Sequence, residues 1–441
     1  MTSDMQPYVL LGLRSTDIFR LYRDLVEYCF GTAMSSSKSR KSLDPSMEDL
    51  PAHLMVDILS RLPVKTIIHC KCVCKKWLDL ISESYFADHH LSRSPSGIMI
   101  YHNSNEVFRN AEEEQKTGYL RTGILRWVEV EDKLDHHYLH HDPIMSLDLN
   151  LAPIFQKSQI LPVGSVNGLL CLWQFGPQHD KTYICNPITR EYMILPKPQY
   201  YLQHNAHLVY CFGVAPLTNE YKVIRIFQGE KIPYFSSNSR PIISQAEVYT
   251  LGTGQWRSLG HVPYWLKGMY GPFLNGHAHW TVLDKDSSEK LCVFDFEKET
   301  FELFPSPPCE ARDENLIFKS LGVLKGCLCR CESYDSQLVV WVMKEYGIKK
   351  SWRKEFVVME SENTDLDLLT LETVDLITGF KDGTVLMASY RDTLLVYCPR
   401  REIILDTEMF YRYFKGYTFR PSFRRLHNFE NERSIHLLYN C

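Results

Sequence analysis

The stretch NGLLCLW, residues 167–173, places an Asn-Gly turn directly before a run of apolar residues. Asn-Gly between apolar runs is typical of a tight β-hairpin, because glycine adopts positive φ at no steric cost. An apolar run, QILPVG, precedes this turn, and the runs LLCLW, TYIC and EYMIL follow it. The stretch therefore predicts a unit of four short strands joined by turns.

The same pattern recurs along most of the chain. Turn positions lie at Asn167, Asn219, Asn275, Lys325 and Asp382, at intervals of 52, 56, 50 and 57 residues. Four strands at a period near 50 residues predict a β-propeller blade, and such units must stack radially because one alone cannot cover its faces. A sixth unit can be assembled from strands near GIMIY, ILRWVEVE and IMSLDL, with a C-terminal strand such as SIHLLY to close it. We expect about six blades, with five or seven as alternatives.

The part of the chain before residue 92 has a different pattern, with helical spacing of its apolar residues. Pro51 suits the first turn of a helix, where its missing N–H costs nothing, and Pro63 disfavours helix in the residue before it. Between them, Leu54, Ile58, Leu59 and Leu62 recur at helical spacing. A second pattern, from Ile67 to Ile81, predicts one or two further helices. We expect a small three-helix domain before the propeller.

These helices carry a family resemblance. The sequence LPAHLMVDILSRLPVKTIIHCKCVCKKWLDLISESYF resembles an F-box over about forty residues without a gap. The stretches GSVNGLLCLW, YICNPITREYMILP, FGVAPLTNEYKVIRI and AEVYTLGTGQWRSL are similar to the F-box-associated, kelch-like domain of plant F-box proteins. The expected architecture is a multidomain α + β chain: an N-terminal extension at 1–45, partly disordered, an F-box at 46–92 and a kelch-like β-propeller at 96–441.

The resemblance implies a function. F-box domains dock on a SKP-type adaptor and through it on a cullin–RING ubiquitin ligase, while the second domain binds the protein to be ubiquitinated. By position, the residues that match the family's adaptor-facing set are Leu50, Pro51, Leu54, Ile58, Leu59, Leu62, Pro63 and Val64, and those that match partly adaptor-facing and partly core positions are Val73, Cys74 and Trp77. The alternative is that these side chains pack the helices together, above all Trp77, Leu80 and Ile81.

Composition limits the other classes of function. The 441 residues carry a formal net charge of −4, which gives no general attraction to nucleic acid or to anionic lipid. Many of the 14 cysteines lie inside apolar runs, as small buried hydrophobes do in a reducing compartment. No apolar run approaches the roughly 18 residues of a membrane span. We expect a protein without a signal peptide that acts in the nucleus, the cytoplasm or both, with no membrane or nucleic-acid partner.

Recognition of a target protein is expected on loops at one face of the propeller. The segment GHVPYWLKGMYGP brings together Tyr264, Trp265, Met269 and Tyr270, and aromatic residues and Met are enriched at interface centres. The alternative is that these four side chains cap a blade edge. A longer loop, residues 227–244, could also reach a partner.

Three other stretches suggest chemistry that we weigh against simpler explanations. HHYLHHD, residues 136–142, has histidines four apart, as zinc sites do, but no second ligand pair with the usual spacing, so we expect a solvated loop and no metal or cofactor. The cysteines at 70, 72 and 74 and at 327, 329 and 331 are spaced for packing rather than for a metal clamp. MFYRYFKGYTFRPSFRR, residues 409–425, could bind single-stranded nucleic acid or form a closing strand and loop.

The sequence predicts a non-catalytic specificity subunit of an SCF-type ligase, which acts by holding a target close to the ubiquitin-carrying enzyme. Two alternatives remain open at this point. One is an F-box scaffold that binds the adaptor outside a ligase, and the other is a metal-dependent propeller enzyme.

Overall fold

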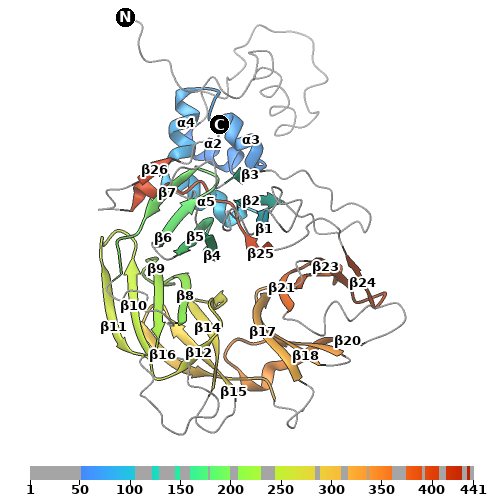
Figure 1. Cartoon of the computed structure of the whole chain (residues 1–441). Helices are drawn as coiled ribbons and strands as arrows, with labels where there is room; N and C mark the ends of the chain where they lie inside the picture. The colour runs from blue at the N-terminus through green and yellow to red at the C-terminus, as the bar shows by residue number, and fades with distance from the viewer. Residues whose placement is uncertain are drawn as a thin grey trace, which may run out of the picture. The chain divides into compact units, whose positions relative to one another are not determined.

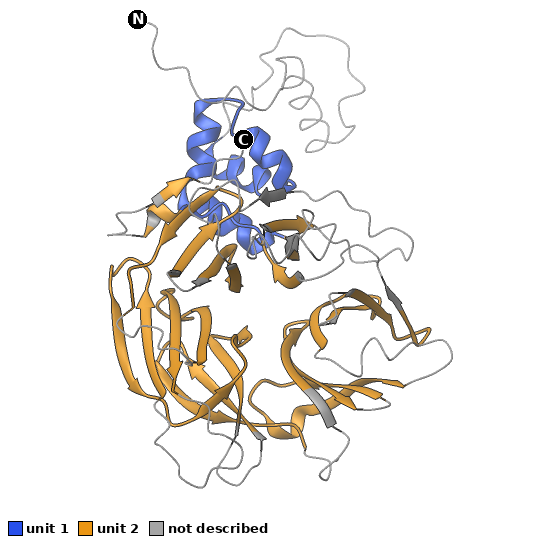
Figure 2. Ribbon diagram, viewed as in Figure 1, with its two compact units in different colours: residues 1–94, 421–425 blue, residues 95–420, 426–441 orange. Residues whose placement is uncertain are grey.

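The structure, a computed structural model, divides into two compact units (Figures 1 and 2). The helical unit contains residues up to Ser94 and residues 421–425, and the propeller unit contains residues 95–420 and 426–441. The residues that the structure describes are 51–104, 122–128, 145–148, 159–176, 179–198, 207–229, 244–283, 289–308, 316–334, 337–359, 374–389, 393–406, 414–429 and 435–437.

The described part of the helical unit has four short helices rather than the three expected. They are α2 (Ala52–Leu59), α3 (Val64–Cys70), α4 (Lys75–Ser82) and α5 (Ser84–Arg93). Pro51 and Pro63 each stand immediately before a helix, with φ of −58° and −56°, because proline's fixed φ suits a helix start. The core is formed by apolar residues of all four helices: Met55, Val56, Leu59, Ile67, Trp77, Leu80, Ile81 and Phe86.

A short segment from the far end of the chain completes this unit. Phe423 is 1% exposed, and its ring lies 5.8 Å from that of Phe86 and 5.0 Å from that of His90. The Lys71 ammonium lies 5.0 Å from the centre of the Phe423 ring. Residues 421–425 therefore belong to the core of the helical unit, although the residues on both sides belong to the propeller unit.

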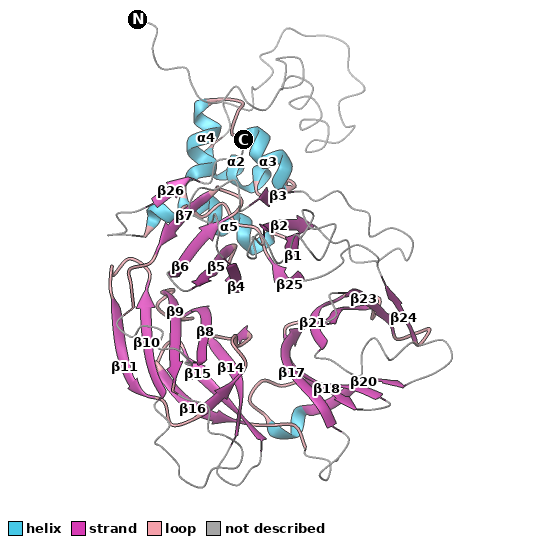
Figure 3. Cartoon of the chain, viewed as in Figure 1, coloured by secondary structure: helices cyan, strands magenta, loops and turns pink. Residues whose placement is uncertain are grey.

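The described residues of the propeller unit form six antiparallel sheets arranged around a common centre, which confirms the predicted six-bladed propeller (Figure 3). Blade 1 consists of β25 (Phe414–Phe419), β1 (Gly97–Ser104), β2 (Thr122–Val128) and β3 (Met145–Asp148). Blade 2 consists of β4 (Gln159–Val166), β5 (Leu169–Gly176), β6 (His179–Asn186), β7 (Glu191–Ile194) and β26 (Ile435–Leu437). Blade 3 consists of β8 (His207–Val214), β9 (Tyr221–Gln228), β10 (Ser244–Thr250) and β11 (Trp256–His261).

Blades 4 to 6 follow in chain order. Blade 4 consists of β12 (Trp265–Lys267), β13 (Phe273–Leu274), β14 (His277–Leu283), β15 (Glu289–Asp295) and β16 (Thr300–Phe304). Blade 5 consists of β17 (Leu316–Leu324), β18 (Cys327–Tyr334), β19 (Gln337–Met343) and β20 (Trp352–Met359). Blade 6 consists of β21 (Val374–Gly379), β22 (Val385–Ser389), β23 (Thr393–Cys398) and β24 (Ile403–Asp406). Two 3₁₀ turns, Lys349–Ser351 and Leu426–Asn428, complete the described elements.

The predicted turns lie between the first and second strands of their blades. Asn167 has φ of 50° and Gly168 φ of 81°, so both residues have the positive φ that a two-residue hairpin requires. Asn275 and Lys325 have φ of 51° and 50°, each followed by a glycine with positive φ. At Asp382 the side chain instead accepts a hydrogen bond from the Thr384 amide at 2.9 Å. The repeat thus uses one turn geometry in blades 2, 4 and 5 and other turns in blades 3 and 6.

The ring is closed by a strand other than the predicted one. β25 pairs with β1, so the C-terminal part of the chain supplies the first strand of blade 1. The expectation that SIHLLY closes the ring is wrong, because its residues 435–437 pair with β7 at the outer edge of blade 2. The closing strand lies within 409–425, which confirms the closing-strand interpretation of that aromatic and basic stretch.

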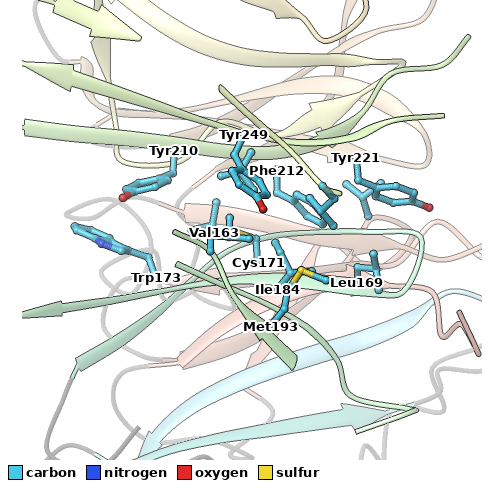
Figure 4. Close-up of a cluster of buried hydrophobic side chains, with 14 of the residues drawn as sticks. Val163, Leu169, Cys171, Trp173, Ile184, Met193, Tyr210, Phe212, Tyr221 and Tyr249 are labelled. Atoms are coloured by element: carbon cyan, nitrogen blue, oxygen red, sulfur yellow. The ribbon is translucent and has the colours of Figure 1, made fainter. Parts of the chain in front are cut away.

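Neighbouring blades bury apolar side chains between them. Between blades 2 and 3, Val163 and Cys171 pack with Tyr210 and Phe212 in a cluster that Figure 4 shows. Cys329 and Cys331 are buried in the corresponding cluster between blades 5 and 6, as expected of packing cysteines. None of the described cysteines forms a disulfide.

Charges buried between blades are paired directly. The Arg225 side chain, on β9, is 1% exposed, and its Nη2 lies 2.6 Å from the Asp180 carboxylate on β6. Its Nη1 lies 3.5 Å from the Glu247 carboxylate on β10. A buried guanidinium is tolerated when carboxylates surround it in this way. This group ties blade 3 to blade 2.

Candidate functional site

The α2–α3 hairpin of the helical unit carries most of the predicted adaptor-facing residues. Leu54 is 43% exposed, and Pro51 and Pro63 are exposed beside the helix starts. Ile58, Val73 and Cys74 are partly exposed. An exposed leucine between two exposed prolines, on a unit this small, is a surface suited to a protein partner.

Other residues of the predicted adaptor-facing set are buried in the helical unit. Leu59, Leu62, Val64 and Trp77 are buried, and we expect these four to act on adaptor binding by holding the helices in place. Trp77, Leu80 and Ile81 are buried, as the packing alternative predicts, and a part of Trp77 in adaptor binding stays a prediction. Leu50 lies outside the described residues.

The buried face of α2 differs from the stripe read from the sequence. That stripe put Leu54 and Ile58 on the same face as Leu59, whereas the buried residues of α2 are Met55, Val56 and Leu59. Apolar residues occur on both sides of this helix, so periodicity alone could not distinguish the two faces. The consequence is that Leu54 is available to a partner.

Charged side chains fix α2 against α5. The Asp57 carboxylate accepts a hydrogen bond from the Arg93 guanidinium at 2.6 Å and another from the Arg61 guanidinium at 3.1 Å. The hydrogen bond from Arg93 holds the pKa of the Asp57 carboxyl below its usual value. Arg93 also donates to the Ser60 hydroxyl at 2.9 Å. These bonds orient the C-terminal end of α2, next to the predicted adaptor surface.

The four predicted target-binding residues of the propeller do not form a single patch. Tyr264 packs on the apolar cluster between blades 3 and 4, whereas Tyr270 packs on the cluster between blades 2 and 3. The Trp265 ring stacks on His207, with centroids 6.4 Å apart, and the Met269 side chain is 37% exposed. Binding of a target by these residues stays a prediction, and most of the 227–244 loop lies outside the described residues.

Tyr270 has a position that the sequence did not suggest. The carbonyl of Met269 accepts a hydrogen bond from the Tyr210 amide at 2.8 Å, and Tyr270 forms a β-bridge with Tyr210. The segment between β12 and β13 therefore lies along β8, the first strand of the neighbouring blade. Gly271 is required for this approach, because a Cβ there would lie 2.6 Å from the Trp280 indole.

Metal and membrane features were searched within the described residues. That part of the chain holds no group of three or more metal-ligating side chains. None of its helices is both long and apolar enough to cross a membrane. The histidines of residues 136–142 lie outside the described part, so the prediction of a solvated loop stays a prediction.

The sequence matches the profiles of two known domain families. The family profile of the F-box associated beta propeller domain matches residues 131–400, and that of the F-box domain matches residues 47–89. The chain belongs to the F-box-associated β-propeller family. This membership confirms the resemblance read from the sequence.

Relatives of this F-box protein include F-box proteins of Arabidopsis thaliana, one of which is also named for kelch repeats. It is 29% identical over 339 residues to F-box protein At3g07870 of Arabidopsis thaliana, covering 71% of this chain and 73% of the relative. It is 26% identical over 368 residues to F-box/kelch-repeat protein At3g23880 of the same plant, covering 80% and 88%. F-box protein CPR1 of Arabidopsis thaliana is 25% identical over 337 residues, covering 72% and 75%.

A solved polysaccharide lyase structure shares 8% identity with this F-box protein at a TM-score of 0.33, covering 55% of this chain and 69% of the lyase chain. A similarity this low carries no conclusion about function.

Proposed function

We propose that this F-box protein is the substrate-recognition subunit of an SCF-type ubiquitin ligase. Its helical unit docks on a SKP-type adaptor, which connects it to a cullin–RING enzyme, and its propeller binds the protein to be ubiquitinated. The observation that carries the proposal is the exposed Leu54, between Pro51 and Pro63, inside the segment that matches the F-box profile.

The subunit performs no covalent step in this proposal. Binding two proteins at once raises the effective concentration of the target near the ubiquitin-carrying enzyme, which accelerates transfer without new chemistry on this chain. We also propose that it acts in the nucleus, the cytoplasm or both, and the cysteines that the structure describes, most of them buried and none in a disulfide, support a reducing compartment. Microscopy of the tagged full chain in plant cells tests the compartment, and secretion would contradict it.

Co-purification of the full chain with a SKP-type adaptor and a cullin tests the ligase role. The variant Pro51→Ala/Leu54→Ala removes exposed apolar surface while leaving the core of α2 intact. We expect it to lose at least about tenfold in adaptor affinity, as truncation of an interface centre does. The matched control is Leu217→Ala, which removes a leucine that is 81% exposed on the propeller unit.

The outcomes separate the alternatives. Adaptor and cullin recovered with the wild type and Leu217→Ala, and lost with the double variant, support the ligase role. Adaptor recovered without cullin contradicts it and supports a scaffold outside a ligase. Equal recovery with all three chains contradicts the assignment of the surface, and circular dichroism verifies that each variant is folded.

A further inference from the structure

Side chains from blades that are not neighbours meet at the centre of the propeller. The Lys415 ammonium, on β25 of blade 1, lies 4.4 Å from the centre of the Tyr270 ring, which belongs to the β12–β13 segment of blade 4. Blades 1 and 4 are three steps apart in a ring of six, and Tyr270 lies along the first strand of blade 3. A contact between such blades is possible only near the ring axis.

A second charged group lies on the neighbouring strand. Asp375, on β21, interacts electrostatically with Lys415 and with Tyr417. β21 is the first strand of blade 6 and contacts β25, the first strand of blade 1. The Thr418 hydroxyl of β25 donates to the Ile377 carbonyl of β21 at 2.9 Å, so the strands that carry Lys415 and Asp375 lie side by side, and the Tyr270 ring contacts Lys415.

Neither charge has a hydrogen-bond or ion-pair partner among the described residues. Within the described part of the chain, Lys415 and Asp375 form no hydrogen bond, and no ion pair within 4.0 Å, with each other or with any other group. The buried Arg225 is the opposite case, because carboxylates lie 2.6 and 3.5 Å from it. A structural role would predict direct pairing, since an unpaired charge away from water is costly.

Both charges are reachable by solvent although protein surrounds them. Asp375 is exposed and Lys415 is partly exposed. Desolvation nevertheless raises the pKa of Asp375 and lowers the pKa of Lys415, with each charge opposing the shift of the other. Both charged forms are therefore less favourable here than in bulk water, and an oppositely charged group bound beside each would stabilise them.

The Tyr270 hydroxyl adds a polar group without a partner. Its oxygen is buried and makes no hydrogen bond within the described part of the chain. The Tyr417 hydroxyl, by contrast, donates to the Pro162 carbonyl at 3.1 Å. An unpaired buried hydroxyl destabilises the protein, and a hydrogen bond to a bound ligand would recover that loss.

We propose that Lys415, Asp375 and Tyr270 form a binding site on the propeller axis for a small zwitterion of the amino-acid type. The ligand carboxylate binds the Lys415 ammonium, its ammonium binds the Asp375 carboxylate, and the Tyr270 hydroxyl bonds to one of the two. A ligand with a single charge would leave the opposite protein charge unpaired, whereas a zwitterion neutralises both. This site is independent of the ligase role.

Titration calorimetry of the purified full chain tests the site. The probes are the L-amino acids, and for each that binds, its N-acetyl form, which lacks the positive charge, and its amide, which lacks the negative charge. We expect at least one amino acid to bind with a Kd below about 1 mM. Both derivatives should bind at least about tenfold more weakly, because each leaves one desolvated charge of the protein unpaired.

Variants locate the binding on the axis. Asp375→Asn and Lys415→Met should each weaken binding at least about tenfold, and Tyr270→Phe, which removes one hydroxyl, by about fivefold. The matched control is Lys354→Met, because the Lys354 ammonium also lies over an aromatic ring, that of Trp341, at 5.3 Å on blade 5. The control should bind as the wild type does.

The possible failures are distinguishable. Absence of heat with every amino acid at 10 mM overturns the proposal, and so does equal binding of an N-acetyl derivative, which would indicate an anion site. Binding that survives Asp375→Asn also overturns it. Should the charge variants fail to fold, Tyr270→Phe keeps the test decisive, because unchanged affinity in that folded variant contradicts the proposed site.

Discussion

The helical unit and the propeller unit bury their apolar residues in different ways. In the helical unit, Leu54, Pro51 and Pro63 stay exposed although the core is well filled. In the propeller, each blade covers the face of the next, so apolar strands are buried within the chain itself. A unit of about fifty residues has too little interior to cover all its apolar side chains. An exposed apolar residue on the helices therefore indicates a partner more strongly than one on the propeller.

The largest expected effect concerns the charges buried between blades. Arg225→Ala leaves the Asp180 and Glu247 carboxylates without their cation, and we expect a loss of about 3–5 kcal/mol in the free energy of unfolding of the propeller. Urea unfolding followed by tryptophan fluorescence measures it. The control in the helical unit is Arg61→Ala, which breaks an exposed pair with Asp57 and should cost less than about 1 kcal/mol. Equal losses would contradict the contrast between buried and exposed pairs.

A substitution in segment 421–425 tests whether the two units are stabilised separately. Phe423→Ala removes a buried ring from the core of the helical unit, and we expect it to lose about 3 kcal/mol. Amide hydrogen exchange, read separately for α2–α5 and for the strands, measures both units at once. Tyr85→Ala, which truncates a ring that is 61% exposed on α5, should change little. Protection lost equally in both units would show that they unfold as one.

Acid should weaken both units through one buried histidine each. Burial lowers the pKa of His90 from 6.5 to about 4, and that of His279 also to about 4. The unfolded chain therefore takes up a proton at a higher pH than the folded protein, so stability is full above about pH 6.5 and falls as the pH decreases towards about 4. At pH 5 we expect a loss of about 2 kcal/mol per histidine.

Thermal unfolding between pH 7 and pH 5 measures this loss. His90→Leu cannot take up a proton, so it should flatten the pH dependence of the helical unit and leave that of the propeller unchanged. A helical unit whose stability is independent of pH in the wild type would contradict the assignment to His90.

The smallest effect concerns the repeated turn. Lys325 has φ of 50°, a conformation that asparagine adopts more readily than lysine. Lys325→Asn should therefore stabilise the propeller by about 0.5 kcal/mol. The reverse change, Asn275→Lys at a φ of 51°, should cost a similar amount. Differential scanning calorimetry compares the two, and a shift of the same sign in both would contradict the shared geometry.

The sequence by itself determined the features that depend on neighbouring residues. The Asn-Gly turns, the period near 50 residues and the helices after Pro51 and Pro63 follow from backbone preferences of single residues. Four of the five turn positions have positive φ, and the F-box match extends over its expected helices. These features could be predicted because their energies do not depend on distant parts of the chain.

Tertiary structure decided which distant segments meet. The closing strand is β25 and not SIHLLY, Phe423 completes a core some 330 residues earlier, and Tyr270 lies along β8 of another blade. It also chose Met55 and Val56 over Leu54 as the buried face of α2. Several apolar segments could have filled each of these places. The free energy of packing selects among them only when the complete surroundings, from blades far apart in sequence, are present.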